Sequence, residues 1–453
     1  MTEHNESEEI TPRFCKTGNG VQHFLQSIAN KAKEQPTYRF RNLYGMIDLE
    51  LLHVSWKALN KKAATGVDGV TVTTYGENLD ENLKGLLVKV KRKAYRAKLI
   101  KRVYIPKEGG KKRPLGILVL EDKILQTAVA KILGEIYEST FLDCSYGYRP
   151  GRNGKLAINN FRDELNFNSY NFVVEADIKG FFDHINHELL IDMLQKRIDD
   201  KHLIHLIGKW LKAGILEPDG KVINPLTGTP QGGIVSPILA NVYLHYALDE
   251  WVEKGMEEVK HGAIKYVRYA DDFVCAFESK RDAVCFYKEL PARLAWFGLE
   301  VAPEKTRLLN FGRYHGKAAQ KFEFLGFELS WGKDRNGRSH LKRVTGRKSL
   351  GRAIKKAGEW FKDNRSLPEK ELIEKLNRKL KGMYAHFGVI GNSAKLSLYF
   401  YLLNKALFKW LNRRSQKKSM TWKKYQTRIR DKLYPPRITE RRVLQRKLPG
   451  IQC

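Results

Sequence analysis

The chain has 453 residues, of which 82 are Lys or Arg and 50 are Asp or Glu, so its formal net charge is +32 at pH 7. It has no run of about 18 apolar residues, which excludes a transmembrane helix, and its acidic start MTEHNESEEI is unlike a secretory signal. The five cysteines form no CxxC pair, which excludes a disulfide framework or thiolate zinc site and indicates a reduced, intracellular protein.

Most of the net positive charge lies at the C-terminal end. Residues 341–453 contain 31 basic and 7 acidic residues, a net charge of +24, whereas the first 340 residues carry 51 basic and 43 acidic residues, a net charge of +8. Aromatic residues are interleaved with this charge at Trp360, Tyr384, Trp410, Trp422 and Tyr425. This combination favours a nucleic acid over an anionic membrane as the partner, with a solvated basic surface as the alternative.

The first third of the chain predicts helices around one hairpin. We expect residues 1–40 to be a polar, weakly ordered lead, followed by a helix in which Leu52, Trp56 and Leu59 recur at helical spacing. LIKRVYIPKEGGKKRPLGI, residues 99–117, predicts two strands around a Gly-Gly turn. Residues 121–141 return to a helical period.

The middle of the chain mixes strands and helices. NFVVEADIKGFFDHI (171–185) predicts a strand that runs into a turn, and the next segment predicts a helix capped by Asn186. GTPQGGIVSPILANVYL (228–244) predicts a Gly-rich loop that leads into an apolar helix. AIKYVRYADDFVCAF (263–277) predicts strand, turn, strand.

The last third predicts short strands and then helices only. Residues 299–311 and 321–331 indicate strand pieces, and the polar stretch 332–349 is interpreted as a linker or surface loop. Residues 369–387 and 392–414 carry apolar residues at helical spacing and predict two helices.

Carboxylates occur at the ends of two predicted strand segments. Alternation places Val173, Glu175 and Asp177 on one face of the first strand, and Asp271 and Asp272 form the tip of the later hairpin. Carboxylates brought together raise each other's pKa unless a cation is present. Oxygen ligands of this kind suit Mg²⁺, and two such ions support phosphoryl transfer. An isolated Asp-Asp pair is also typical of a solvated turn.

The ordered motifs resemble those of a known family. YADD (269–272) fits the YxDD hairpin of reverse transcriptases, FVVEADIKGFFDHI resembles the strand of their first catalytic aspartate, and GTPQGG resembles their nucleotide-site loop. The 99–117 hairpin resembles their fingers hairpin, and SYGYRPGRN, GLEVAPEKTRLLNF and FEFLGFEL match further blocks in order. LNRKLKGMYAHFGVIGN and LNRRSQKKSMTW resemble the maturase domain. From Asn42 to Trp422 the chain is identified as a member of the bacterial group II intron reverse transcriptases and maturases.

The resemblance implies an α+β fold: a right-hand-like polymerase, with fingers and a palm that carries an antiparallel sheet, followed by an all-α thumb and maturase region (domain X). We therefore expect a polar lead at 1–40, fingers and palm at 41–335, thumb and maturase at 336–435 and a short basic tail at 436–453.

The resemblance also implies site residues. Asp177, Asp271 and Asp272 would be the catalytic triad and, with the backbone carbonyl of Ile178, would bind two Mg²⁺ ions. The implied dNTP contacts are Lys107 and Arg113 for the triphosphate, Phe182 as a steric gate against a ribose 2′-OH, and Gln231 and Gly232 as pocket lining. The implied supporting residues are Lys305 and Arg307, and the implied RNA contacts are Arg413, Arg414, Lys417 and Lys418. Surface charge is the alternative for Lys107, Arg113, Lys305 and Arg307, and a core aromatic is the alternative for Phe182.

By the same resemblance we expect an RNA-directed DNA polymerase that extends a DNA primer on an RNA template with dNTPs and binds group II intron RNA to promote splicing and mobility into target DNA. The alternatives are a splicing-only RNA-binding maturase and a reverse transcriptase recruited for host defence or DNA repair. We expect it in the bacterial cytoplasm at the nucleoid, without a membrane partner.

A Cys/His-rich endonuclease domain is not expected. After Leu341 the chain has only His386 and Cys453 as potential soft ligands, which is not a zinc-ligand spacing. A primer end would then come from another source, such as a replication fork.

Overall fold

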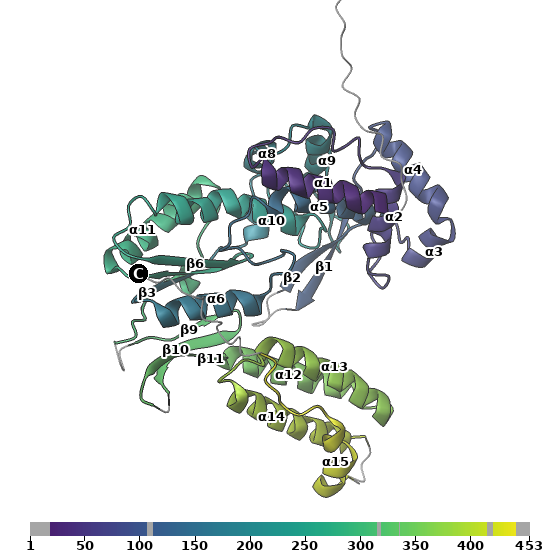
Figure 1. Cartoon of the computed structure of the whole chain (residues 1–453). Coiled ribbons are helices and arrows are strands. Elements are labelled where there is room, and N and C mark those ends of the chain that lie inside the picture. The colour runs from purple at the N-terminus through teal and green to yellow at the C-terminus, as the bar shows by residue number, and fades with distance from the viewer. Residues whose placement is uncertain (1–18, 107–111, 315–318, 335, 415–419, 441–453) are drawn as a thin grey trace, which may run out of the picture. The chain divides into compact units, whose positions relative to one another are not determined.

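The structure, a computed structural model, describes residues 19–106, 112–314, 319–334, 336–414 and 420–440 (Figure 1). The chain divides into two compact units built from separate stretches of sequence. Unit 1 comprises Met1–Gly151, Asp177–Val259 and Lys288–Ala302, and unit 2 comprises Arg152–Ala176, Lys260–Tyr287 and Pro303–Cys453. No helix in the described ranges is long and apolar enough to cross a membrane.

Unit 1 is mostly helical. Its helices are α1 (Asn19–Glu34), α2 (Leu49–Ala58), α3 (Val72–Glu77), α4 (Leu79–Lys91), α5 (Leu120–Glu138), α7 (Phe181–His184), α8 (His187–Gln195), α9 (Lys201–Leu211) and α10 (Ser236–Leu244). The π-helical segments His245–Asp249 and Trp251–Gly255 follow α10, and α11 (Lys280–Trp296) crosses the division between the units. Helices α1, α2 and α5 pack against one another, and α5, on which no residue is exposed, forms the centre of this layer.

Helix α1 lies where the sequence suggested a polar lead. Val21, Ile28 and Ala32 are buried and share one helical face, which packs against α5. The many polar residues of this segment occupy the opposite face, so its overall composition hid an amphipathic helix. The prediction of a weakly ordered stretch is therefore wrong over residues 19–34, and residues 1–18 lie outside the described ranges.

The predicted hairpin is confirmed. Strands β1 (Ile100–Pro106) and β2 (Lys112–Ile117) pair antiparallel, in register from Lys101 opposite Ile117 to Pro106 opposite Lys112. Strand β1 also pairs in parallel with the short β4 (Ile215–Leu216), which pairs with β5 (Val222–Ile223), so the sheet order is β2-β1-β4-β5.

The predicted helices of unit 1 are also confirmed. The buried residues of α5 include Ile124, Ala128, Ile132 and Ile136, which lie four residues apart, in agreement with the helical period predicted for residues 121–141. Helix α8 begins after Asn186, whose side-chain oxygen accepts hydrogen bonds from the backbone N–H groups of Glu188 and Leu189.

Unit 2 contains two antiparallel sheets. The first has the order β6-β7-β3-β8, formed by β6 (Ile264–Tyr269), β7 (Asp272–Phe277), β3 (Phe172–Asp177) and β8 (Arg307–Asn310). The second has the order β11-β10-β9, formed by β11 (Ser339–Thr345), β10 (Phe327–Lys333) and β9 (Phe322–Phe324). Helix α6 (Gly154–Phe167) packs against β6 and β11. The division between the units falls at the end of β3, between Ala176 and Asp177.

The interpretation of residues 332–349 as a linker or surface loop is wrong. Strand β11 lies within this stretch and pairs with β10 along its length, from Phe327 opposite Thr345 to Lys333 opposite Ser339. Leu341, Arg343 and Thr345 are buried although the stretch is rich in Gly, Lys and Arg. The polar composition concealed the alternation of buried and exposed positions.

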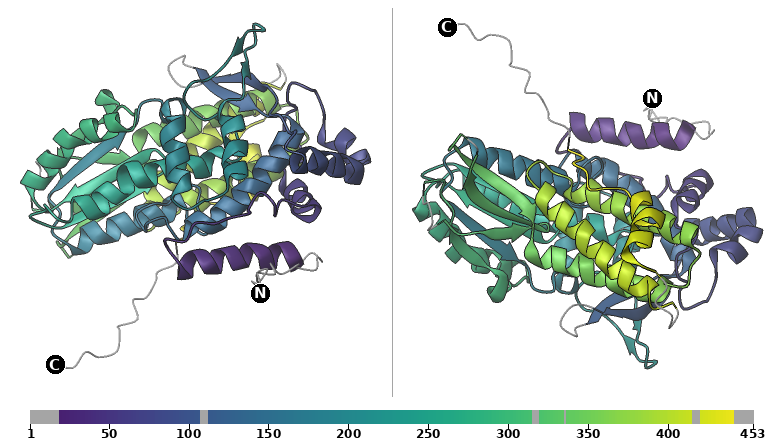
Figure 2. Two further views of the ribbon diagram at one scale, coloured as in Figure 1. Left: turned by 90° about the horizontal axis from the view of Figure 1, so that it is seen from above. Right: turned by 90° about the horizontal axis from the view of Figure 1, so that it is seen from below.

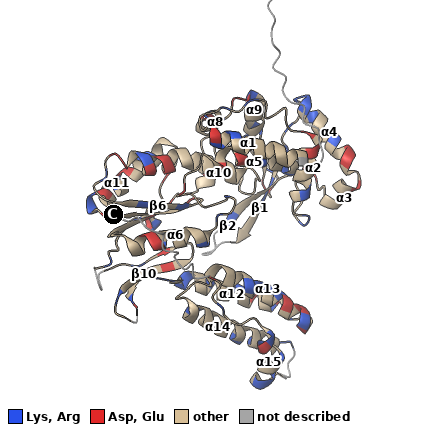
Figure 3. Ribbon diagram, viewed as in Figure 1, with Lys and Arg blue, Asp and Glu red and all other residues tan. Residues whose placement is uncertain are grey.

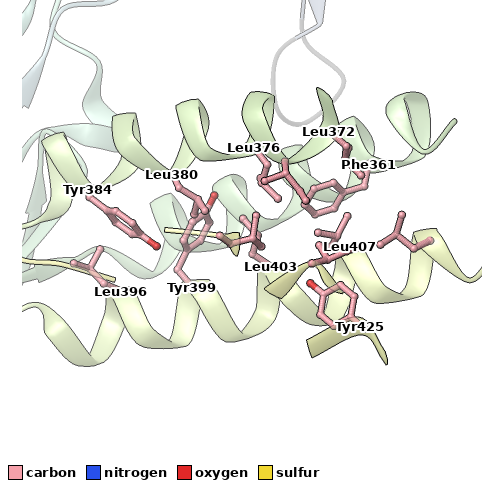
Figure 4. Packing of buried hydrophobic residues seen from close by; sticks show 14 of the residues in the cluster. Phe361, Leu372, Leu376, Leu380, Tyr384, Leu396, Tyr399, Leu403, Leu407 and Tyr425 are labelled. Carbon is pink, nitrogen blue, oxygen red and sulfur yellow. The ribbon is translucent and has the colours of Figure 1, made fainter. Parts of the chain in front are cut away.

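The remainder of unit 2 is helical: α12 (Arg347–Asn364), α13 (Glu369–Phe387), α14 (Ser393–Leu411) and α15 (Trp422–Arg428). Helices α12, α13 and α14, hereafter the helical bundle, lie side by side (Figure 2) around one apolar core, whose members on α13 and α14 point toward each other (Figure 4). The predicted α13 and α14 are confirmed, as is the α+β class with a helical C-terminal region. Helix α12 was not predicted, because only Leu350 and Phe361 are buried along it.

Candidate active site

The acidic pair lies at the tip of the β6–β7 hairpin. Tyr269 pairs with Asp272, so Ala270 and Asp271 form a two-residue turn. Ala270 has a φ of +57°, a conformation that costs a residue with a Cβ about 1 kcal/mol. The fully buried Arg268 donates a hydrogen bond of 3.0 Å from Nη1 to the carbonyl of Ala270. This contact supports the strained turn that presents Asp271 and Asp272.

Asp177 ends the strand next to this hairpin. In the sheet β3 adjoins β7, and the N–H of Asn171, directly before β3, donates to the carbonyl of Phe277 at the end of β7 (2.9 Å). The start of β3 therefore lies beside the end of β7, so the two strands run antiparallel. Asp177 ends β3 and Asp272 begins β7, which are the two strand ends at the same edge of the sheet.

The backbone after Asp177 sets the direction of the Ile178 carbonyl. The carbonyl of Asp177 accepts a hydrogen bond from Ala302 (2.8 Å), the N–H of Lys179 donates to Glu300 (2.8 Å), and Ile178 forms the bridge with Val301 between them. Backbone groups of successive strand residues point to opposite sides. The Ile178 carbonyl therefore points away from residues 300–302.

These donors fit a hard cation. Asp272 is exposed, Asp177 and Asp271 are half-buried, and all the predicted ligands are carboxylate or carbonyl oxygens, which Mg²⁺ prefers. Among the described residues, however, no three His, Cys, Asp or Glu side chains are arranged so that they could hold a metal ion. The magnesium site therefore stays a prediction.

Arg307, one of the two predicted supporting residues, contacts the strand of Asp177. It lies opposite Glu175 in the β3–β8 pair, and its Nη2 forms an ion pair with Glu175 Oε2 at 2.5 Å. Burial raises the pKa of Glu175, and Arg307 partly counteracts this rise. Lys305 is exposed at the end of the short helix Pro303–Lys305.

Three of the predicted dNTP contacts lie around one cavity of unit 1, with a volume of about 330 Å³. Phe182 and Gln231 line it, together with Arg102, Tyr104 and Pro114 of the β1–β2 hairpin. Arg113 donates a hydrogen bond from Nε to Gln231 Oε1 (3.2 Å). Phe181 beside it is 2% exposed and fills the core position, so Phe182 is a cavity residue rather than a core aromatic.

The loop that carries Gln231 and Gly232 lies against strand β2. The N–H of Gly116 donates to the Gln231 carbonyl (2.6 Å). Gly232 has a φ of +116°, and a Cβ at this position would lie 2.4 Å from the carbonyl oxygen of Gly116. Only glycine therefore fits this approach of two backbones.

A buried polar network that was not predicted holds the other end of this loop. Gln126 of α5 is 1% exposed, and its Oε1 accepts hydrogen bonds from the N–H groups of Ile234 (3.0 Å) and Val235 (3.4 Å). Ser236 Oγ accepts from Thr229 Oγ1 (2.5 Å) and donates to the Pro230 carbonyl (3.0 Å). The signal in the sequence was a glutamine on the apolar face ILQTAVAKIL, where a buried amide requires partners.

The predicted RNA contacts are only partly described. Arg413 lies 5.1 Å from the centre of the Trp410 ring, and Arg414 donates to the carbonyl of Leu367 (2.9 Å). Both are exposed. Lys107, Lys417 and Lys418 lie outside the described residues.

Comparison with known proteins agrees with this geometry. Residues 105–329 match the reverse transcriptase (RNA-dependent DNA polymerase) family, and residues 350–428 match the maturase-specific domain of group II introns. The group II intron-encoded protein LtrA of Lactococcus lactis subsp. cremoris is 28% identical, over 85% of this chain and 76% of LtrA. Protein YkfC of Escherichia coli (strain K12) is 32% identical, over 56% of this chain and 75% of YkfC.

A third relative, the uncharacterized 91 kDa protein in a cob intron of Schizosaccharomyces pombe, is 27% identical over 87% of this chain and 57% of its own length. The reverse transcriptase match covers strand β2, the β6–β7 hairpin and the Gly-rich loop described above, and the maturase match covers most of α12 and all of α13 and α14. The chain belongs to the family of group II intron-encoded reverse transcriptases and maturases.

Proposed function

We propose that the chain is the RNA-directed DNA polymerase of a group II intron and that it also binds the intron RNA to promote splicing and mobility into target DNA. Polymerase activity is supported by one observation: Asp177 and Asp272 lie at the ends of two neighbouring antiparallel strands, and Asp271 lies in the adjoining turn. These three carboxylates and the Ile178 carbonyl would hold two Mg²⁺ ions. When bound, such ions stabilise negative charge on the attacking and leaving oxygens.

The side chains of unit 1 would position the incoming dNTP. Arg113, oriented by its hydrogen bond to Gln231, would bind the triphosphate with Lys107. Phe182 would contact the sugar and exclude a ribose 2′-OH, because it lines the same cavity as Gln231. Gly232 would keep the loop backbone against Gly116 of β2 and so hold Gln231 at the nucleotide.

The polymerase proposal is tested by primer extension on an RNA template with Mg²⁺ and dNTPs. Asp271→Asn removes a charge from the turn and should slow DNA synthesis at least roughly 100- to 1,000-fold, the loss seen when one stabilising group is removed from a charged transition state. RNA affinity should be unchanged. The matched control is Asp219→Asn, which changes an exposed turn aspartate and should extend normally. Extension by Asp271→Asn at the wild-type rate refutes the proposal.

The splicing proposal is supported by the basic C-terminal region, which contains the helical bundle and carries a net charge of +24 over residues 341–453. In this proposal the RNA supplies the chemistry of splicing and the protein stabilises the folded RNA. Asp271→Asn should therefore promote splicing of the intron RNA as well as the wild type does.

If the wild-type chain extends primers but does not promote splicing, the result would instead favour a reverse transcriptase recruited for host defence or DNA repair. A protein that promotes splicing but extends no primer would be a splicing-only maturase. Location at the nucleoid stays a prediction.

A further inference from the structure

A second cavity of unit 1 is lined mostly by basic residues. It has a volume of about 320 Å³, and its walls are Arg96, Ala97, His205, Gly208, Lys209 and Lys212. His205 and Lys209 lie four residues apart on one face of α9, and Lys212 is the C-cap residue of that helix. Figure 3 colours the lysines of α9 blue. Arg96 comes from the segment between α4 and β1. This basic pocket shares no lining residue with the cavity around Phe182 and Gln231.

The positive charge of the basic pocket is not neutralised by carboxylates. Among the described residues, the side chains of Arg96, His205 and Lys212 form no hydrogen bond or ion pair, and Lys209 Nζ donates to a neutral acceptor, the Tyr95 carbonyl (2.7 Å). Nearby basic residues of the same unit are paired: Arg102 with Glu217 and Lys89 with Glu121, both at 3.2 Å. A concave surface lined by charges of one sign concentrates counter-ions.

The helix dipole explains only part of this cluster. Lys209 and Lys212 lie at the C-terminal end of α9, where a cation interacts favourably with the free carbonyl groups. His205 lies a turn earlier and Arg96 comes from another segment, so neither is explained in this way.

Glycine at position 208 leaves the floor of the basic pocket open. A Cβ at Gly208 would have no atom within 4 Å, so packing does not require glycine there. Glycine in a helix interior costs about 1 kcal/mol relative to alanine. Its position between His205 and Lys209 leaves free the space that a bound group would fill.

We propose that the basic pocket binds phosphate groups, at a site separate from the dNTP cavity. The phosphate belongs either to the backbone of a polynucleotide or to a free phosphate compound. The charges on the chain favour the polynucleotide, since a protein with a net charge of +32 attracts a polyanion. The proposal concerns binding alone, so its failure would leave the polymerase proposal untouched.

The first experiment measures the affinity of the full chain for a labelled single-stranded RNA as a function of salt, without Mg²⁺ or dNTPs. The double variant Arg96→Gln/Lys212→Gln removes two pocket cations and should reduce the slope of log K against log salt by about 1.4, or about 0.7 for each phosphate contact on a single strand. The control Lys84→Gln/Lys201→Gln removes two exposed lysines outside the pocket and should reduce the slope by less than half as much.

The second experiment fills the basic pocket without changing its charge. Gly208→Leu should reduce the salt slope of RNA binding as the double variant Arg96→Gln/Lys212→Gln does. The rate of primer extension on a short template should be unchanged.

A calorimetric titration with inorganic pyrophosphate, into the wild type and into Gly208→Leu, distinguishes a polynucleotide from a free phosphate compound. A changed RNA slope without pyrophosphate binding indicates a polynucleotide, and pyrophosphate binding lost in Gly208→Leu with an unchanged RNA slope indicates a free phosphate compound. If the RNA slopes of pocket and control variants agree and pyrophosphate binds neither protein, the proposal is overturned. If Gly208→Leu does not fold, the salt dependence of RNA binding by Arg96→Gln/Lys212→Gln alone decides whether the basic pocket binds RNA.

Discussion

The loop at residues 228–236 and the helical bundle of α12–α14 are held by different kinds of contact. The loop depends on buried hydrogen bonds from Gln126, Thr229 and Ser236 and on one backbone approach that only Gly232 permits. The bundle depends on stripes of leucine and aromatic side chains that meet in one core (Figure 4). Hydrogen bonds fix a direction at each atom, whereas apolar contacts are non-directional. Directional hydrogen bonds suit a loop that has to position a nucleotide. Non-directional apolar contacts are sufficient for a bundle whose core only has to keep its charged surface folded.

The largest effect is expected from an apolar truncation in the bundle. Leu403→Ala removes a side chain that is 1% exposed, so it should lower the free energy of unfolding by about 2–5 kcal/mol. Leu398→Ala on the same helix is the control, because Leu398 is 41% exposed, and it should cost less than about 1 kcal/mol. Urea unfolding of both variants measures the difference. If both variants lowered the free energy of unfolding equally, the stability of the bundle would not depend on its apolar core.

A smaller but more specific effect is expected in the loop. Gln126→Leu keeps the approximate side-chain volume but leaves the N–H groups of Ile234 and Val235 without their acceptor, which costs about 1–3 kcal/mol. Because the loop carries Gln231, the KM for dNTP should also rise. The control is Thr127→Val, which removes a neighbouring hydroxyl that bonds only to its own helix, at the Lys123 carbonyl. It should leave the KM unchanged, and a KM that rises equally in both variants would contradict a positioning role for Gln126.

The same difference in contacts explains what could be predicted from the sequence. Periodicity predicted α5, α13 and α14, because each buries a stripe of apolar residues. Turn chemistry predicted the β1–β2 and β6–β7 hairpins, and one side chain predicted the cap at Asn186. These features are all encoded in short windows of the chain.

Other features depend on partners distant in sequence. Strand β11 carries polar residues and is recognisable only through its pairing with β10, and α12 has few buried residues of its own. The family resemblance named the aspartates, Phe182 and Gln231 by motif. It did not name Gln126 or Arg268, because the groups that they bind are visible only after folding.

A polar contact between α15 and α14 of the bundle sharpens the comparison. Tyr425 is fully buried and its hydroxyl donates to Asn404 Oδ1 (2.6 Å), while burial raises its pKa above the ordinary value. Tyr425→Phe should cost about 1 kcal/mol without any change in the KM for dNTP. Tyr399→Phe is the matched control, since the Tyr399 hydroxyl has no hydrogen-bond partner among the described residues, and thermal unfolding should show a smaller loss. A cost for Tyr425→Phe as large as that for Leu403→Ala would mean that the bundle, like the loop, depends on directional contacts.

The smallest effect is expected on the outer face of the bundle. Lys375 forms an ion pair with Glu371 one turn earlier on α13 (2.7 Å), and both side chains are partly exposed. A pair of this spacing contributes about 0.3–0.5 kcal/mol. A double-mutant cycle of Lys375→Gln and Glu371→Gln should give this coupling at low salt and almost none at high salt, because exposed charges are screened. A coupling above about 1 kcal/mol that persists in salt would contradict this expectation. The surface charges of the bundle contribute little to its folding, so they can be selected for binding a polyanion.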